Sequence, residues 1–134
     1  MLRKLFLLCV TVSFSTNLFA AELELQFVGA SKTALDNPHD LKLSPDRKYL
    51  FVSDVGNNRV VLLNPETLEF ISSFGADEQS GTHDVDFDSS GRAYVADTHN
   101  NRIAVYTMNG PNAEFSEQIT GPIRGPEGVL AAAA

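Results

Sequence analysis

The feature that most constrains this 134-residue sequence is a pattern that occurs twice in full and begins a third time. His39-Asp40 recurs 44 residues later as His83-Asp84, and Asn57-Asn58-Arg59 recurs as Asn100-Asn101-Arg102. A third copy begins at Gly125. Internal repeats with a period of roughly 20 to 50 residues are typical of solenoids and propellers, in which each repeat is one unit that buries its faces against its neighbours. We therefore expect stacked units rather than one continuous core.

Each full copy contains four short segments rich in β-branched and aromatic residues, separated by turn formers such as Ser44-Pro45-Asp46 and Asn109-Gly110-Pro111. No segment shows a sustained helical period. The expected strands are 41–43, 49–53, 60–63 and 69–74 in the first copy and 85–87, 93–96, 103–106 and 114–119 in the second. Four antiparallel strands recurring every 40 to 45 residues or so are typical of a propeller blade.

We therefore predict an all-β fold over residues 21–134, an incomplete β-propeller of four-stranded antiparallel blades. The repeats are expected at about 37–80 and 81–124, with the start of a third at 125. This amounts to about 2.5 blades, whereas closed propellers have roughly four to eight.

The first 20 residues have the layout of a secretory signal peptide. Arg3 and Lys4 precede an apolar run at 5–12, which is followed by a polar patch and by small residues at Ala20 and Ala21. The apolar run is too short to span a bilayer, which takes roughly 20 residues. We predict cleavage near Ala20, a secreted or periplasmic protein, and no membrane span.

The charge and composition limit the partners and the chemistry. The 17 acidic and 10 basic residues give a formal net charge of −7, and removal of Arg3 and Lys4 with the signal peptide lowers it to −9. Nucleic acid is excluded as a partner, because phosphate binding requires a basic surface. Cleavage also removes Cys9, the single cysteine, so the mature protein would have no thiol nucleophile and no disulfide.

The repeated residues resemble the NHL repeat of β-propellers. The shared pattern is Pro-His-Asp-Leu or Thr-His-Asp-Val, a strand ending in Val-Ser-Asp or Val-Ala-Asp, and then Asn-Asn-Arg with Val or Ile. The first copy, at 44–52, is also similar to the YVTN-type repeat of exported bacterial propellers. The resemblance covers residues 23–129 and implies the fold, but fold alone does not specify activity.

Four charged residues repeat at the same place in both copies, and we expect them to be structural. Asp54 and Asp97 close a strand, where a carboxylate can accept hydrogen bonds from the amides of the loop two and three residues later. Arg59 and Arg102 can then tie neighbouring blades together through their five donors. The intervening asparagines are expected to form left-handed turns.

His39 and His83 are the candidates for chemistry. They precede strands that would line the propeller channel, and imidazoles that converge there can bind a divalent transition metal. The resemblance implies a comparison with peptidyl-hydroxyglycine amidating lyases, which bind zinc through at least three such histidines and also use Tyr and Arg. Here Glu127 takes the third place. The alternative is a pair of hydrogen-bonded histidines at the channel rim, and His99, which has Gly56 as its counterpart, is expected on a surface loop.

Three carboxylates, Asp40, Asp84 and Asp86, are expected to form a polar channel wall, because residues two apart on a strand share a face. The sequence contains no glycine-rich phosphate loop and no Gly-x-Ser-x-Gly elbow. Duplicated structural residues without a complete catalytic set favour an exported module that binds a protein, peptide or carbohydrate. A metal-dependent lyase or hydrolase is the alternative.

The number of blades leaves a third interpretation open, a truncated gene product without independent function. The expected strand at 23–28 corresponds to the outermost strand of a preceding blade and would close the ring by pairing with a last blade. Either several copies associate to complete the propeller, or blades that follow residue 129 are missing, because open sheet edges and apolar faces favour association.

Overall fold

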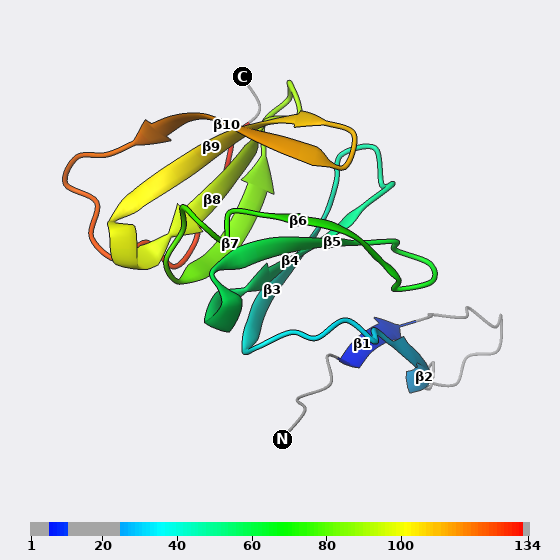
Figure 1. The fold of residues 1–134 in the computed structure, drawn as a ribbon. Coiled ribbons are helices and arrows are strands. Elements are labelled where there is room, and N and C mark those ends of the chain that lie inside the picture. Colours follow the sequence, from blue (N-terminus) through cyan, green and yellow to red (C-terminus); the bar gives the residue numbers. More distant parts are fainter. Residues whose placement is uncertain (1–5, 11–24, 133–134) are drawn as a thin grey trace, which may run out of the picture.

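The computed structural model describes residues 6–10 and 25–132, and its described residues form ten strands with two single-turn helices (Figure 1). Two four-stranded antiparallel sheets account for eight of the strands. The first sheet contains β3 (Pro38–Leu43), β4 (Leu50–Asp54), β5 (Arg59–Leu63) and β6 (Phe70–Phe74). The second contains β7 (Thr82–Phe87), β8 (Ala93–Asp97), β9 (Arg102–Asn109) and β10 (Asn112–Ile119). The single-turn 3-10 helices are η1 (Val55–Asn57) and η2 (Thr98–Asn100).

The order of strands in each sheet follows the chain, so each repeat is one up-and-down blade. The predicted all-β, partial propeller fold is confirmed, and all eight expected blade strands are present. The prediction placed the first strand of each blade too late, at 41 and 85, because it left out the His-Asp dipeptides. In the structure β3 and β7 begin at Pro38 and Thr82 and include these dipeptides.

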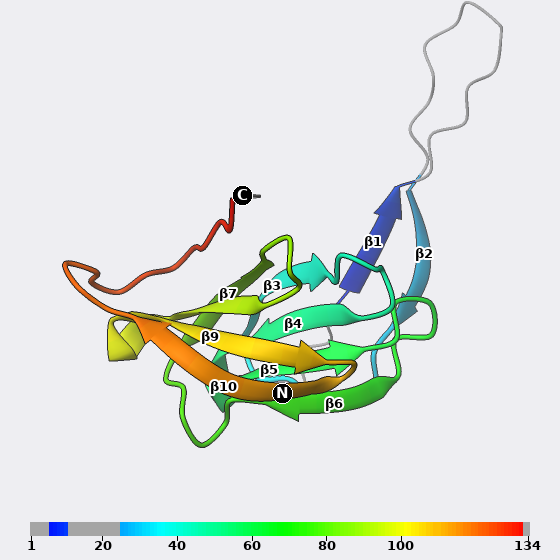
Figure 2. The ribbon, with the colours of Figure 1, turned by 90° about the horizontal axis from the view of Figure 1, so that it is seen from above.

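The two blades pack face to face, as the view from above shows (Figure 2). Phe51 in β4 meets Phe87 in β7 with ring centroids 4.8 Å apart, and Phe74 in β6 meets Tyr106 in β9 at 4.7 Å. The cluster also holds small and branched side chains with no exposed surface, among them Val95. Such strands are apolar on both sides because each blade has neighbours on both faces. This packing fixes the first strands of the two blades side by side.

The other face of the first blade forms a second cluster, in which Val52, Val61 and Leu68 are buried. Leu35, from the segment before β3, packs against it. The strand expected at 23–28 is present as β2 (Leu25–Ala30), and among the described residues its partner is β1 (Phe6–Val10). The rest of the predicted signal peptide lies outside the described residues. Its cleavage, and with it the domain boundary at residue 20, stays a prediction.

Candidate functional site

The two His-Asp dipeptides lie on the first strands of neighbouring blades, and both fall where the strand pairing is irregular. The β3–β4 register shifts between Pro38 and Leu41, and the β7–β8 register shifts between Thr82 and Val85. A bulge leaves residues unpaired and re-aims their side chains, and bulges are common beside active sites. The same irregularity in both repeats therefore presents the histidines and aspartates in equivalent ways.

The imidazole rings of His39 and His83 are in direct contact. Their centroids are 4.7 Å apart, and the ring planes meet edge to face at 76°. Nδ1 of His83 lies 3.0 Å from the carbonyl oxygen of Gly81 and 2.7 Å from Oγ1 of Thr98. A carbonyl oxygen only accepts hydrogen bonds, so Nδ1 carries a proton, as assigned from this network. In the neutral ring the lone pair is then on Nε2, the nitrogen that can act as a base or a ligand.

Asp84, one of the three acids expected to form a polar channel wall, directly follows His83 on β7. The Asp84 carboxylate accepts hydrogen bonds from the backbone amides of Val85 (2.7 Å) and Val129 (2.8 Å). Burial and the adjacent carboxyl of Asp40 raise the pKa of Asp84 despite these two amides. The carboxyl of Asp84 therefore holds its proton more readily than an exposed aspartate does.

Asp86 is held differently, by a lysine of the first blade that sequence reasoning missed. Oδ1 of Asp86 lies 2.7 Å from Nζ of Lys42, and Oδ2 accepts a hydrogen bond from the amide of Ala131 at 2.9 Å. Burial acts to raise the pKa of Asp86, but the hydrogen bonds from Lys42 and Ala131 outweigh it, so the pKa is lowered. Asp86 is thus an ionised partner of Lys42, whereas Asp84 shares its environment with a second acid.

The metal centre that the repeated histidines suggested does not fit the groups that come together here. Among the described residues, no three His, Cys, Asp or Glu side chains are grouped closely enough to hold a metal ion. Glu127, the expected third ligand, is exposed on the segment that begins the third repeat. A zinc site takes three or four such donors, so the residues present do not fit a metal centre.

Asp54 lies in a hydrogen-bonded cluster that fastens the first blade to the segment before it. Its Oδ1 accepts a hydrogen bond from the backbone amide of Asp36 at 2.7 Å, and its Oδ2 accepts from Nδ2 of Asn57 (2.9 Å) and Nε of Arg59 (2.8 Å). Nη2 of Arg59 also donates to the carbonyl of Ala34 at 2.9 Å. The carboxylate therefore accepts hydrogen bonds, but not from the loop amides that the sequence suggested.

Asp97 repeats this cluster in the second blade with Ser80, Asn100 and Arg102. Arg102 also donates to the carbonyl of Glu78 at 2.8 Å, so each arginine reaches the segment that precedes its own blade. Both arginines thus tie their blade to the preceding segment through a backbone carbonyl.

In each blade one asparagine ties the blade to the following repeat, and the sequence did not predict this contact. Asn58 and Asn101 adopt the expected left-handed conformation, with φ of 54° and 53°. Their side-chain oxygens accept hydrogen bonds from the amides of Gly81 (2.7 Å) and Gly125 (3.0 Å). Gly81 and Gly125 each begin the next copy of the repeat. Their equivalent positions were the one sequence signal that could have indicated these hydrogen bonds.

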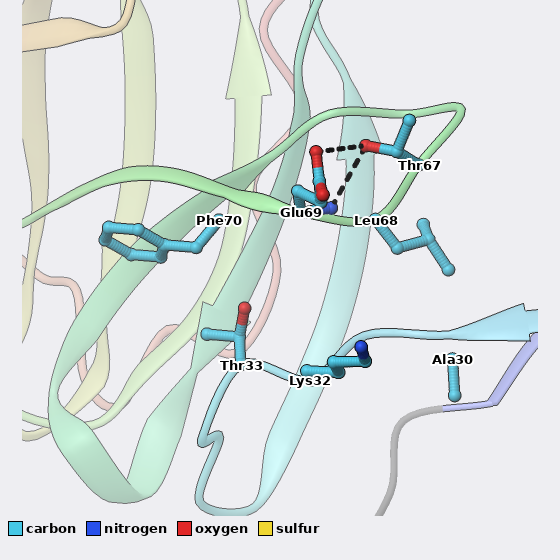
Figure 3. Close-up of a pocket in the computed structure, with 7 residues that line it drawn as sticks. All are labelled: Ala30, Lys32, Thr33, Thr67, Leu68, Glu69 and Phe70. Atoms are coloured by element: carbon cyan, nitrogen blue, oxygen red, sulfur yellow. Dashed lines mark hydrogen bonds between the residues drawn. The ribbon is translucent and has the colours of Figure 1, made fainter.

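Two cavities among the described residues lie away from the histidine pair. The larger one, about 540 Å³, lies where the segment after β2 passes the turn between β5 and β6 (Figure 3). Its lining is mixed, comprising Ala30, Lys32, Thr33, Thr67, Leu68, Glu69 and Phe70. The second, about 260 Å³, lies among the turns after β3, β7 and β9. We place the candidate site at His39 and His83, because chemically versatile groups gather there.

A search against known families gives one match that bears on this arrangement. Residues 16–132 match the family described as lactonase, 7-bladed beta-propeller. The chain belongs to this family. In a propeller the blades surround a central channel. In this lactonase-family chain the first strands of the two blades, β3 and β7, lie side by side, and the amides of Val129 and Ala131 bind the acids of β7.

Solved structures include a propeller similar to this lactonase-family chain. The crystal structure is of a Bacteroides uniformis protein to which 6-phosphogluconolactonase activity is ascribed. It matches with a TM-score of 0.58 and 22% identity over 90% of this chain. The match spans 36% of that protein, about a third of its length. No curated protein matches the sequence. In the described residues, no helix has the length and apolar character needed to cross a membrane.

Proposed function

We propose that this chain forms part of the active site of a propeller that hydrolyses lactones, with His83 as the general base. The observation that carries the proposal is the protonated Nδ1 of His83, which leaves Nε2 as the basic nitrogen beside His39. Membership in the lactonase family and the adjacent pair of acids, Asp40 and Asp84, support it. Membership in the lactonase family favours a cyclic ester as the substrate class, and its hydrolysis needs a base, a proton donor and water.

The reaction balances with these groups alone. Nε2 of His83 takes a proton from water while the water oxygen attacks the carbonyl carbon of the lactone. The tetrahedral intermediate then breaks its bond between the carbonyl carbon and the ring oxygen. The ring oxygen takes a proton from the pair formed by Asp40 and Asp84, giving an open-chain hydroxy acid. The proton on His83 returns to the acid pair through solvent, and the product acid releases its own proton at neutral pH.

Each acid has a position consistent with its role. Asp84 is held by the amides of Val85 and Val129, so its carboxyl has a fixed orientation next to His83 in the chain. Its raised pKa favours a shared proton with Asp40. Asp86, paired with Lys42, is ionised and does not serve as the donor.

The test measures hydrolysis of glucono-δ-lactone and its 6-phosphate by the purified protein above the spontaneous rate. His83→Gln is expected to lower kcat about 100-fold or more, the range for loss of a general base. His99→Gln is the matched control, because His99 lies in η2 outside the ring pair, and it should leave kcat unchanged. A wild-type rate equal to the spontaneous rate, or equal rates for the two variants, would refute the proposal.

The binding module predicted from the sequence is the second candidate. The joints that repeat from blade to blade favour it, because Asn58 and Asn101 hold successive repeats in the same relation without involving His83. We infer that these contacts, which fit an NHL-type repeat, hold the blades together whether the protein is an enzyme or a binding module. Binding of the lactones without turnover, unchanged by His83→Gln, would favour the module over the enzyme.

A further inference from the structure

Thr98 sits between His83 and the beginning of the third repeat. It is the first residue of η2 and is buried, with 8% of its surface exposed. Its Oγ1 lies 2.7 Å from Nδ1 of His83 and 2.6 Å from the carbonyl oxygen of Pro126. Nothing in the repeat pattern marks this residue, because its counterpart in the first blade is Val55.

The direction of the two hydrogen bonds follows from the chemistry of the three groups. The carbonyl of Pro126 can only accept, so the single hydroxyl proton of Thr98 is donated to it. The hydroxyl oxygen then presents a lone pair to Nδ1 of His83, which must donate. The result is a relay from His83 through Thr98 to Pro126, in which each donor has an acceptor.

We propose that Thr98 is a positioning residue that keeps the proton of His83 on Nδ1 and leaves Nε2 as the basic nitrogen. The opening segment of the third repeat contributes to this positioning, because the carbonyl of Pro126 orients the hydroxyl of Thr98. The backbone also holds this geometry, since the amide of Thr98 donates to the carbonyl of Gly81 at 3.2 Å and brings both acceptors of His83 together. The catalytic meaning of this relay rests on the proposed function, whereas the proton position does not.

The two histidines therefore differ, although their positions in the repeat are equivalent. Valine at position 55 has no hydroxyl to offer His39, so the relay belongs to the second blade. One oriented imidazole with a second ring in edge-to-face contact suits a single general base better than a symmetric pair would. The asymmetry identifies His83, rather than His39, as the base.

The experiment reads the proton position directly, by long-range ¹H–¹⁵N NMR of the full chain with ¹⁵N-labelled histidine. Wild type and Thr98→Ser, which retains the hydroxyl, are expected to show His83 protonated on Nδ1. Thr98→Val, which places the first-blade residue at this position, removes the shorter of the two contacts of Nδ1 and leaves the carbonyl of Gly81. It is expected to raise the fraction of His83 protonated on Nε2, the form that free histidine prefers. The signals of His39 and His99 serve as internal controls and should not change.

An unchanged His83 tautomer in Thr98→Val, in a protein whose other signals show it folded, would overturn the proposal. So would a wild-type His83 protonated on Nε2 alone. Activity separates this inference from the proposed function. If the tautomer shifts as expected but wild type hydrolyses no lactone, the positioning role holds and the lactonase proposal fails. If both hold, Thr98→Val should lower kcat and Thr98→Ser should restore it.

Discussion

Replacing Asp97 with asparagine should destabilise the protein strongly, although the two side chains have the same shape. The Asp97 side chain has no exposed surface and accepts hydrogen bonds from three donors. These are the amide of Ser80 on Oδ1 (2.7 Å), Nε of Arg102 on Oδ2 (2.7 Å), and Nδ2 of Asn100. Asparagine has one oxygen, so either orientation of its amide directs an NH₂ group at one of these donors.

The expected cost follows from these contacts. One hydrogen bond to a charged group is lost, worth about 1.5 to 3 kcal/mol, and a buried donor is left facing another donor. Removing one partner of a buried ion pair costs about 3 to 5 kcal/mol. Arg102 keeps 16% of its side-chain surface exposed and can be partly solvated, so we expect a loss of about 3 kcal/mol in the free energy of unfolding.

Urea denaturation followed by circular dichroism measures this loss. Asp54→Asn should cost a similar amount, because Asp54 has the same three kinds of donor in the first blade. Asp77→Asn is the matched control, since Asp77 is exposed and should stay within about 0.5 kcal/mol of wild type. If Asp97→Asn also stays within that limit, the aspartate clusters do not hold the blades as we describe.

Three further predictions concern separate parts of the chain. Ser53→Ala should raise the free energy of unfolding by about 1 kcal/mol in urea denaturation, because Ser53 Oγ is the one buried side-chain polar atom without a partner among the described residues. The second blade already has Ala96 at that position, and a loss of stability would contradict the prediction. Burial raises the pKa of Tyr106 to about 12, above about 10 in the unfolded chain. The stability due to its neutral phenol should therefore be complete below pH 10 or so and decline toward pH 12, and equal slopes for wild type and Tyr106→Phe over that window would count against it. Mass spectrometry of exported protein should find Ala21 at the N-terminus, whereas an intact Met1 in that fraction would exclude the signal peptide.

The strands of the blades could be predicted from the sequence because each strand is marked by a local pattern of residues. Runs such as Tyr49 to Ser53 are apolar on both sides, and turn formers bound them. The pairing of His39 with His83 could be expected for the same reason, since equivalent positions of stacked repeats are neighbours.

Contacts between residues far apart in sequence could not be predicted in this way. The oxygen of Asn58 meets Gly81, and Thr98 reaches Pro126, only after the blades have stacked. The donors to Asp54 and Asp97 differ from those expected because the 3-10 turns present asparagine side chains to the carboxylates, rather than loop amides. The residues expected to hold a metal do not form a set of three donors among the described residues, and position 127 carries an exposed glutamate.

A crystal structure of the protein with the δ-lactam of gluconic acid tests the central claim most directly, because a lactam mimics the lactone ring but resists hydrolysis. The account predicts the lactam carbonyl carbon next to Nε2 of His83, with a water or the ring nitrogen within hydrogen-bond distance of the acids Asp40 and Asp84. A lactam bound instead in the cavity lined by Lys32, Thr67 and Glu69, with the histidine pair unoccupied, would contradict it.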